Sequence, residues 1–453
     1  MLKNNVRERL VLTDTFSENK IREFMTTETE TISLDLSQQQ AVDRISSLSS
    51  RIYLLIGAGG SGKTFTIQHL LEQLWADESN EITNETTYLA APTGKASKVI
   101  NDAFALAEFE TYNEAKTIHR LLEFHPRFGW TFNNDNPLDA TLVILDEASM
   151  VDSLLLFRVI DALPEGCILI LVGDENQLPP VAPGQPFTDL ITCGSQDIIN
   201  RLTTNHRQAQ GSLIADGCLK ILDGKMPTFG RPGENTLGGI LQDDMFMIEE
   251  DDKENIPEIV AGICRPWHEQ GLDYAVLAPQ KTGVVGVDAM NKYLQEELNP
   301  AATNKAQIKV AWLTLRVGDK VLQTKNNYNL GVFNGFGGVI KKIGMDFDGE
   351  EIIVVDFDGQ LVTYRESKDI KELALGYCMT IHKSQGSQFK HGVLVFHSSH
   401  YYMASRSIFY TAVSRFRQEL HIVGDKRMIK RGLSNVVSGE RNTYIKLKLG
   451  GEL

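Results

Sequence analysis

The sequence predicts an α/β fold with two parallel sheets, one inserted β-hairpin and one inserted small β domain. From Leu36 onward, apolar runs of strand length alternate with helical patterns, which is typical of parallel sheets covered by helices. Residues 308–364 break this alternation with glycines and β-rich runs, and the alternation then resumes. The chain has 453 residues, and this length favours roughly two to four domains.

The first half of the chain predicts one complete α/β unit. Its strand candidates are 52–56, 87–91, 141–145 and 168–172, and its helices are 63–75, 94–106 and 150–162. A glycine or polar cluster follows each strand: 57–64, 92–95, 146–149 and 173–177. Because ligands of open α/β sheets bind at the carboxyl ends of strands, these four clusters describe one site.

The second half repeats the pattern around its insertion. Strands are expected at 274–278, 393–397 and 420–423, with helices near 287–298 and 404–416. A second interruption, in the first half, spans about 122–138. There Phe128, Trp130 and Phe132 alternate around Gly129 and lead into a run of turn-forming Asn and Asp residues, which suggests a β-hairpin. The plainer interpretation is that these aromatic rings pack the hairpin onto its own domain.

Composition excludes several classes of protein. Hydrophobic residues make up 42% and charged residues 23%, the values of a globular protein. No apolar run approaches the roughly 18 residues of a membrane span, and no signal-length apolar stretch follows Lys3, Arg7 and Arg9. The five cysteines form no C-x-x-C pair, so we expect neither a disulfide framework nor a zinc site, and a reducing cytoplasm fits.

The charge balance limits how the chain binds nucleic acid. The net charge is −14, which argues against coating nucleic acid through bulk charge. A local basic or polar channel inside an acidic shell remains compatible with it. Much of the acidity lies within residues 243–258, which the simplest interpretation makes a solvated face or loop.

The strongest motif is GAGGSGKT, which follows the first apolar strand and opens a helix. Its spacing is that of a phosphate-binding P-loop, in which backbone N–H groups and a helix N-terminus hold phosphates. The expected nucleotide-binding residues are Gly57, Ala58, Gly59, Gly60, Ser61, Gly62, Lys63 and Thr64. Lys63 is suited to the β- and γ-phosphates and Thr64 to Mg²⁺. Taken alone, the motif is also compatible with a glycine turn that binds nothing.

Polar residues after later strands complete a nucleotide hydrolase site. Asp146 and Glu147 follow an apolar strand; Asp146 is suited to hold Mg²⁺ and Glu147 to orient and deprotonate water. The alternative for this pair is a helix cap. Gln177 is suited to touch the γ-phosphate and a moving element. Gln40, upstream of the first strand, carries an amide that could pair with an adenine edge, or it is a surface glutamine.

Taken together, the motifs resemble superfamily 1 DNA helicases of the RecD-like and Dda-like group. The resemblance runs in order over about 36–425. Its segments include Gln40, APTGKA at 91–96, TIHRLL at 117–122, LDEASM at 145–150, GDENQLPPV at 173–181, LTTNHRQ at 202–208, MTIHKSQGSQF at 379–389 and YTAVSR at 410–415. At Gln388 some relatives carry an acidic residue, which leaves the role of that residue open.

The resemblance implies a fold and a domain plan. It implies two RecA-like parallel-sheet domains with ATP between them: a polar extension over 1–35, a first domain over 36–204 and a second over 205–453. A β-barrel insertion of about 308–370 interrupts the second domain. Arg207, Gly386 and Arg415 would join the nucleotide site from the second domain. A planar guanidinium neutralises charge that develops on γ-phosphate oxygens.

The same resemblance implies contacts with single-stranded DNA. The expected contacts are Thr93, Lys95 and His119 on the first domain, and Thr380, His382, Lys383 and Ser384 on the second. In this family the hairpin splits the duplex, so Phe128, Trp130 or Phe132 would stack on the last base pair. Expected partners are single-stranded DNA, duplex junctions and single-strand-binding, replication or recombination proteins. The compact build also fits a phage-encoded enzyme acting in the host cytoplasm.

The sequence therefore predicts an ATP-dependent DNA helicase, for which the resemblance implies 5′-to-3′ polarity. The first alternative is a motor subunit of a larger recombination or nuclease complex. The second is a non-catalytic nucleic-acid-binding module with a vestigial ATP site. Lys63, Glu147, Arg207 and Arg415 are all present, and this argues against the vestigial site.

Overall fold

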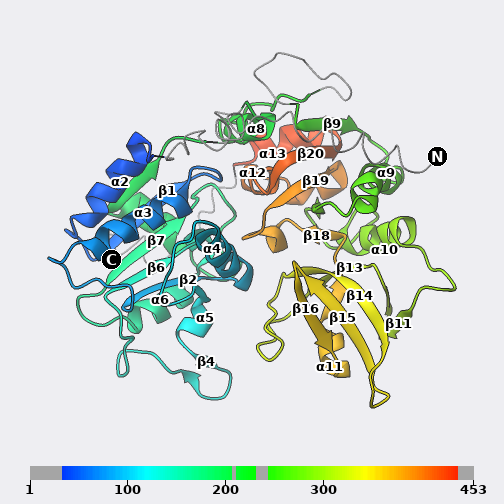
Figure 1. Cartoon of the computed structure of the whole chain (residues 1–453). Helices are drawn as coiled ribbons and strands as arrows, with labels where there is room; N and C mark the ends of the chain where they lie inside the picture. The colour runs from blue at the N-terminus through cyan, green and yellow to red at the C-terminus, as the bar shows by residue number, and fades with distance from the viewer. Residues whose placement is uncertain (1–32, 207–210, 231–242, 437–453) are drawn as a thin grey trace, which may run out of the picture. The chain divides into compact units, whose positions relative to one another are not determined.

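The computed structural model describes residues 33–206, 211–230 and 243–436. Predictions for residues 1–32 and for Arg207 therefore lie outside the described residues. Two parallel sheets dominate the described part. We call the residues of the first sheet and its helices the first lobe, and those of the second sheet and its helices the second lobe (Figure 1).

The first lobe contains a six-stranded sheet in the order β3-β2-β6-β7-β1-β8. Its strands are β1 (Ile52–Gly57), β2 (Thr87–Ala91), β3 (Lys116–Thr117), β6 (Leu142–Leu145), β7 (Ile168–Gly173) and β8 (Ile199–Leu202). All its strand pairs are parallel. β6 and β7 are buried along their whole length, which explains why they read as uninterrupted apolar runs.

Three helices of the first lobe are those that the sequence predicts: α3 (Lys63–Ala76), α4 (Gly94–Leu106) and α6 (Ser153–Asp161). Its other described helices are α2 (Leu36–Ser46), α5 (Ile118–Leu121) and α7 (Pro186–Cys193). Short polar side chains begin three of the first-lobe helices: Thr93 accepts from the Ala96 amide, Thr117 accepts from the Arg120 amide, and Asp152 accepts from the amides of Leu154 and Leu155. These caps satisfy N–H groups that have no partner within the helix.

The second lobe contains a five-stranded parallel sheet in the order β18-β10-β19-β20-β9. Its strands are β9 (Met245–Glu249), β10 (Tyr274–Ala278), β18 (Cys378–Thr380), β19 (Phe389–Phe396) and β20 (Phe416–Gly424). Its helices are α8 (Leu213–Leu222), α9 (Ile256–Glu269), α10 (Val287–Leu298), α12 (Arg406–Val413) and α13 (Lys426–Ser434). Three of the strands and two of the helices are those that the sequence predicts.

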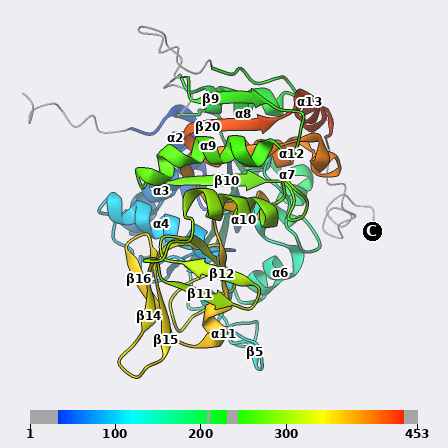
Figure 2. The same ribbon diagram turned by 90° about the vertical axis from the view of Figure 1, so that its right-hand side faces the viewer.

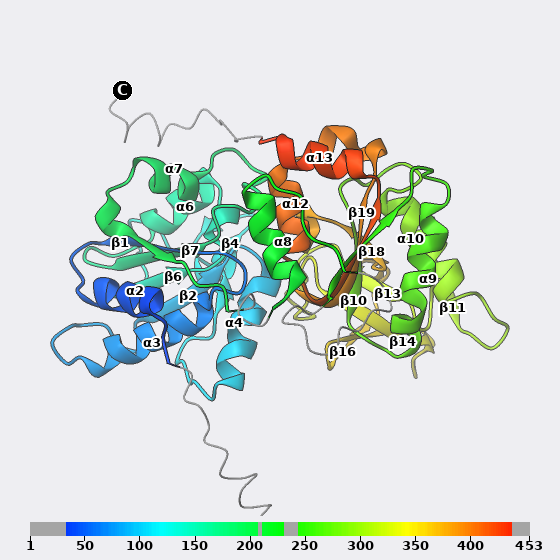
Figure 3. The same ribbon diagram turned by 90° about the horizontal axis from the view of Figure 1, so that it is seen from above.

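Alternating residues of the second sheet face two separate cores. Val276 and Val393 belong to the core that contains residues of α9 and α10, whereas Leu277 and Leu394 belong to the core that contains residues of α8, α12 and α13. Figure 3 shows these two groups of helices on opposite sides of the strands. Because side chains alternate along a strand, a sheet covered on both faces buries every residue of its central strands.

The inserted sheet, residues 320–375, is an antiparallel unit in the order β16-β15-β14-β13-β17. Its strands are β13 (Lys320–Gln323), β14 (Gly337–Met345), β15 (Glu351–Phe357), β16 (Gln360–Tyr364) and β17 (Leu373–Leu375), with α11 (Ser367–Ile370) before the last. A separate hairpin, β11 (Gln307–Val310) and β12 (Leu313–Arg316), precedes it. The strands of the inserted sheet thus begin and end later than the expected 308–370.

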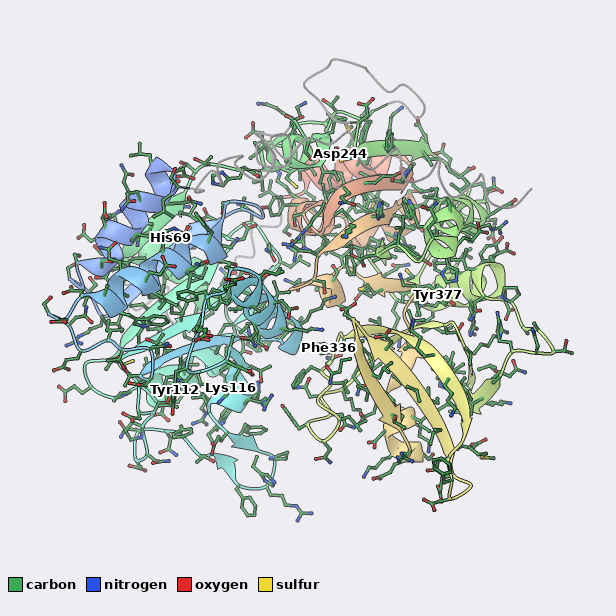
Figure 4. All side chains as sticks on the ribbon, in the orientation of Figure 1. His69, Tyr112, Lys116, Asp244, Phe336 and Tyr377 are labelled. Carbon is green, nitrogen blue, oxygen red and sulfur yellow. The ribbon has the colours of Figure 1, made fainter. Side chains whose placement is uncertain are left out.

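A buried carboxylate holds the inserted sheet to α10. Asp319 has no exposed surface, and burial raises its pKa although its hydrogen bonds act in the opposite direction. Its oxygens accept hydrogen bonds from Gln295 Nε2 (2.6 Å), Asn299 Nδ2 (2.7 Å), the Arg316 amide (2.7 Å) and the Tyr377 hydroxyl (2.9 Å). Figure 4 labels Tyr377 where the second-lobe strands meet the inserted sheet.

The aromatic hairpin, residues 122–138, is small. Its two strands are β4 (Phe124–His125) and β5 (Gly129–Trp130), joined by two residue pairs. The predicted hairpin is therefore present, but its regular part ends at Trp130. Two residue pairs provide little stability of their own, so the hairpin depends on packing against the first lobe.

Candidate nucleotide and nucleic-acid site

The P-loop lies between β1 and α3 and has the backbone that its glycines permit. Gly60 and Gly62 have φ values of 92° and 77°, in the left-handed region that other residues rarely adopt. A Cβ atom on Gly57 would lie 2.2 Å from Ser61 Oγ, so that position has no room for a side chain. Lys63 folds across the loop, and its Nζ donates to the carbonyls of Gly57 (2.8 Å) and Ala58 (3.2 Å).

The acidic pair lies at the carboxyl end of β6. The Glu147 amide donates to Asp146 Oδ1 at 2.7 Å, and Glu147 has a left-handed backbone with φ 51°. Burial and the Glu147 charge raise the pKa of Asp146 to about 6, while the Lys63 ammonium lowers it. These three side chains therefore form one electrostatic unit. A carboxylate facing a lysine at a P-loop suits a bound cation and phosphate.

The end of β7 brings Asp174 and Gln177 to the same edge. Gln177 is 7% exposed, and its side-chain oxygen receives no hydrogen bond from the described residues. A buried amide oxygen without a partner is costly, which fits a position that a ligand or bound water completes. Asp174 is buried and accepts a hydrogen bond from the Tyr410 hydroxyl at 2.6 Å.

That bond joins the first lobe to α12 of the second lobe, and two more lie beside it. The Leu178 amide donates to Thr411 Oγ1 at 3.1 Å, and Gln385 Nε2 donates to the Leu178 carbonyl at 3.3 Å. Motifs from β7, α12 and the segment after β18 therefore meet at one buried contact. Sequence reasoning placed these motifs in series but did not identify Asp174, Tyr410, Thr411 or Gln385 as contacts.

Arg415 is buried, with 2% of its surface exposed. Its guanidinium donates to the carbonyls of Thr411 and Ser387 and to Ser414 Oγ, each at 3.2 Å. A Cβ atom on Gly59 of the P-loop would lie 3.9 Å from Ser414 Cβ, so the segment that carries Arg415 borders the P-loop. Gly386 has φ 71°, and a Cβ atom there would lie 3.0 Å from Thr93 Oγ1. Gly386 therefore borders the APTGKA segment, residues 91–96, which is an expected contact of single-stranded DNA.

The structure places Gln38, and not Gln40, against the P-loop, so the adenine contact expected of Gln40 stays a prediction. Gln40 is exposed, whereas Gln38 is 1% exposed, and its Nε2 donates to the Ser61 carbonyl at 3.1 Å. The physical reason is helical phase: the buried face of α2 contains Gln38, Ala41, Val42 and Ile45, so Gln40 points away from it. The spacing of Gln38 from this apolar stripe was the signal that could have found it.

The segment before Arg207 also borders the P-loop. The His206 amide donates to the Gly60 carbonyl at 3.2 Å, and the His206 ring lies 3.2 Å from Gln38 Nε2. Arg207 itself lies outside the described residues. Its expected role in the nucleotide site thus stays a prediction, supported by the position of the residue before it.

The first-lobe residues that are expected to contact DNA differ in their exposure to solvent. Thr93 begins α4. Lys95 lies with its Nζ 4.9 Å from the centre of the Phe389 ring, and burial lowers its pKa. Burial also lowers the pKa of His119. Its ring contacts the Trp130 ring at a centroid distance of 5.2 Å.

The three aromatic candidates of the hairpin separate into two kinds. Trp130 and Phe132 are half-buried and pack against the first-lobe core. Phe128, in the turn, is 85% exposed and stacks on His125 at 4.8 Å. The packing interpretation therefore holds for Trp130 and Phe132, while Phe128 is the ring that the structure leaves free to contact a base pair.

The second-lobe DNA candidates follow β18. Lys383 is exposed, and Thr380 and His382 are half-buried; burial lowers the pKa of His382. Ser384 is fully buried, and its hydroxyl donates to the Ile381 carbonyl at 2.8 Å. In this structure the Ser384 hydroxyl stabilises the turn, and the expected contact of Ser384 with DNA stays a prediction.

Three family models match the chain in the order of these parts. The model described as an AAA domain matches residues 38–183, the ATP-dependent RecD-like DNA helicase SH3 domain matches 290–357, and the UvrD-like helicase C-terminal domain matches 375–423. In three parts, the chain is therefore similar to an AAA domain, to the SH3 domain of ATP-dependent RecD-like DNA helicases and to the C-terminal domain of UvrD-like helicases.

Sequence relatives narrow this class. The ATP-dependent RecD2 DNA helicase of Deinococcus radiodurans is 32% identical over 86% of this chain, which spans about half of that relative (49%). The RecBCD enzyme subunit RecD of Mycolicibacterium smegmatis is 27% identical over 87% of this chain and 72% of that protein. The chain is thus related to the RecD-like helicases, and the predicted resemblance is confirmed.

Solved structures confirm the predicted fold. The Pif1 helicase from Candida albicans has a TM-score of 0.51 at 18% identity, covering 88% of this chain and 98% of that one. The Pif1 helicase from Bacteroides in complex with ADP-AlF3 and single-stranded DNA has a TM-score of 0.52 at 20% identity, covering 88% and 94%. Among the described residues, we found no helix long and apolar enough to cross a membrane.

Proposed function

We propose that the protein is an ATP-dependent DNA helicase that moves along single-stranded DNA. The observation that carries this proposal is the buried hydrogen bond between Asp174 and Tyr410. It joins the strand end beside the P-loop to the helix that leads to Arg415. A change at the nucleotide therefore has a direct route to the relative position of the lobes, which is what a motor needs.

The nucleotide site has residues that fit Mg²⁺ and ATP. The glycine cradle has no room for a side chain at Gly57, and Lys63 already points across it. Thr64 and Asp146 would hold Mg²⁺. Gln40, which is exposed, would contact the adenine, while Gln38 donates to the Ser61 carbonyl of the P-loop. Bound Mg²⁺ would neutralise charge on the phosphate oxygens.

The remaining residues would act on water and on charge. Glu147 would orient the attacking water and accept its proton. Gln177 has a buried amide oxygen that no described residue hydrogen-bonds, and this side chain would respond to the γ-phosphate. Arg415, with Arg207, would stabilise the charge that develops on the γ-phosphate oxygens. Arg415 is held by backbone carbonyls here, so its approach would require the α12 segment to shift.

The DNA strand would cross motifs that adjoin this contact. Thr93 borders Gly386, and Thr380, His382 and Lys383 continue from the same segment. His119 lies at the base of the aromatic hairpin. Hydroxyl, imidazole and a few lysine groups hold phosphates without reading sequence. We infer 5′-to-3′ movement from the family resemblance alone. A DNA substrate also fits a protein that acts in the cytoplasm.

The direct test is phosphate release with and without oligo(dT), together with unwinding of matched duplexes that carry 5′ or 3′ overhangs. We expect DNA to stimulate hydrolysis and the 5′ overhang to be preferred. An absence of stimulation would favour the non-catalytic binding module and reject this proposal. Preference for the 3′ overhang would reject only the polarity.

Replacing Lys63 tests the nucleotide site. We expect Lys63→Ala to reduce DNA-stimulated phosphate release by roughly 100-fold or more, because a positioned cation in a dry site is lost, while single-strand binding is largely retained. Lys225→Ala is a matched control, since Lys225 is an exposed lysine far along the chain. Unchanged turnover in the Lys63 variant would contradict the assignment.

A motor subunit of a larger complex is the second candidate, because the relatives named RecBCD enzyme subunit RecD cover most of this chain. Size-exclusion chromatography with partner capture, followed by unwinding assays on the isolated chain, distinguishes the two. An isolated monomer that unwinds forked DNA favours the first proposal. Strong hydrolysis without unwinding until a partner is added favours the second.

A further inference from the structure

A cavity of about 420 Å³ lies where α10, the β11–β12 turn, β17 and β18 meet. We call it the lysine-rimmed pocket. Leu313, Leu373 and Leu375 contribute apolar surface to it, and Trp312 also lines it although 78% of Trp312 is exposed. Figure 2 shows α10 and the β11–β12 hairpin near one another. A large exposed aromatic ring beside an apolar hollow is typical of a site that stacks a planar ligand.

Four lysines also line this pocket: Lys281, Lys292, Lys371 and Lys383. All four are exposed, and within the part of the chain that the structure describes none of them forms an ion pair. One carboxylate, that of Asp288, lines the pocket with them. In a chain with net charge −14, this concentration of unpaired positive charge favours an anionic ligand.

The neighbouring sheet edge argues against a peptide that would add a β-strand. β18 is the last strand of its sheet, and an open edge would invite such pairing. Asn291 closes it: its Nδ2 donates to the Cys378 carbonyl at 2.8 Å, and its Oδ1 accepts from the Cys378 amide at 2.9 Å. The side chain thus replaces a strand at this position, and stacking and charge remain as the means of recognition.

The backbone presents Trp312 at a constrained turn. β11 and β12 are joined by two residues, and the first of them, Ala311, has φ 56°. Residues other than glycine seldom adopt that conformation. The turn fixes the backbone position of Trp312. A planar ligand that stacks on this ring would therefore cost less conformational entropy than one that stacks on a ring in a flexible loop.

We propose that the lysine-rimmed pocket is a nucleobase subsite for single-stranded DNA, in which one base stacks on Trp312 and the adjoining phosphates lie against the lysines. It rests on the proposed function, because Thr380 and Lys383 line this pocket and also belong to the expected DNA path. The subsite extends that path from the second lobe onto the β11–β12 hairpin. The base is held by stacking on its face, so binding does not depend on which base is present.

The test measures oligo(dT) affinity by fluorescence anisotropy for the full chain and three variants. We expect Trp312→Ala to weaken binding roughly five- to tenfold and Trp312→Phe to restore most of the loss, since stacking depends on an aromatic face. Phe347→Ala is the matched control, because Phe347 is fully exposed on the β14–β15 turn and does not line the pocket. Equal affinity of Trp312→Ala and Phe347→Ala would overturn the proposal.

An abasic spacer moved along the oligonucleotide gives a second, independent readout. We expect one position at which the spacer weakens wild-type binding but causes no further loss in Trp312→Ala, because the two changes remove the same contact. If the loss of affinity caused by the spacer and the loss caused by Trp312→Ala simply multiply at every spacer position, the proposed subsite is wrong. If wild-type protein binds no oligo(dT) and shows no stimulated hydrolysis, the proposed function fails first.

The occupant is tested by acrylamide quenching, taking the difference between wild-type and Trp312→Phe fluorescence. Protection of Trp312 by oligo(dT), and not by an octamer of glutamate, supports the nucleobase subsite. Protection by the glutamate octamer alone would assign the pocket to an acidic protein segment and overturn the proposal.

Discussion

The two insertions of this chain are built in opposite ways. The inserted sheet has five strands, and residues such as Val355 and Phe357 belong to one of the buried cores. The aromatic hairpin has two residue pairs and rings that are at most half-buried. The first is held by a buried polar network and the second by aromatic packing at its base. The difference predicts that the inserted sheet is the more rigid of the two insertions and that the tip of the hairpin moves more easily.

The largest effect is expected at Asp319, which anchors the inserted sheet. Asp319→Ala removes the acceptor of four hydrogen bonds and leaves buried donors without partners. We expect the free energy of unfolding to fall by about 3–5 kcal/mol, as measured by denaturant titration. Asp348→Ala, at an exposed turn, should change it by less than about 0.5 kcal/mol. A loss below about 1 kcal/mol at Asp319 would show that the network is not the anchor.

An intermediate effect is expected at Trp130. Its ring lies 4.6 Å from the Phe124 ring and 5.2 Å from the His119 ring, so Trp130→Ala removes the packing at the base of the hairpin. We expect a loss of about 1–3 kcal/mol in the free energy of unfolding, with strand separation impaired more than DNA-stimulated hydrolysis. If stability is unchanged while unwinding falls, Trp130 contacts DNA rather than the protein.

The smallest effect on stability is expected at Phe128. Because this ring is 85% exposed, Phe128→Ala should change the free energy of unfolding by less than about 0.5 kcal/mol. Strand separation on forked DNA should nevertheless fall several-fold, since base stacking contributes about 1–3 kcal/mol per base. Hydrolysis stimulated by oligo(dT) is the control measurement and should be retained. Unwinding at the wild-type rate would remove the wedge role from this ring.

Part of the architecture could be predicted because buried parallel strands have a clear sequence pattern. β1, β6 and β7 are continuous apolar runs followed by chemical motifs. β9 and β18 were not predicted: β9 lies within the acidic stretch of residues 243–258, and β18 has three residues whose strand character comes from pairing with β10. Pairing between distant segments is a tertiary property that local propensity does not encode.

The candidate site was predictable where one motif determines its own backbone geometry, as in the P-loop. It was less predictable where the direction of a side chain determines which residue makes the contact. The P-loop, Asp146 and Glu147 lie together as their positions at strand ends imply. The contact of Gln38 with the P-loop was not predicted, because the phase of a short helix decides which of three adjacent glutamines is buried. Asp174 and Tyr410 are 236 positions apart, and nothing local in either motif indicates the other.

Asp319 also sets how the inserted sheet joins its host. The Arg316 amide, just before the first inserted strand, and the Tyr377 hydroxyl, just after the last, bind the same carboxylate. The entry and exit of the insertion are therefore stapled to one point beside α10. Because the entropic cost of closing a loop grows only slowly with its length, we expect this junction to accept insertions of different lengths. A longer or shorter inserted domain would leave its two ends beside α10, so the sheet of the second lobe could keep its strands in place.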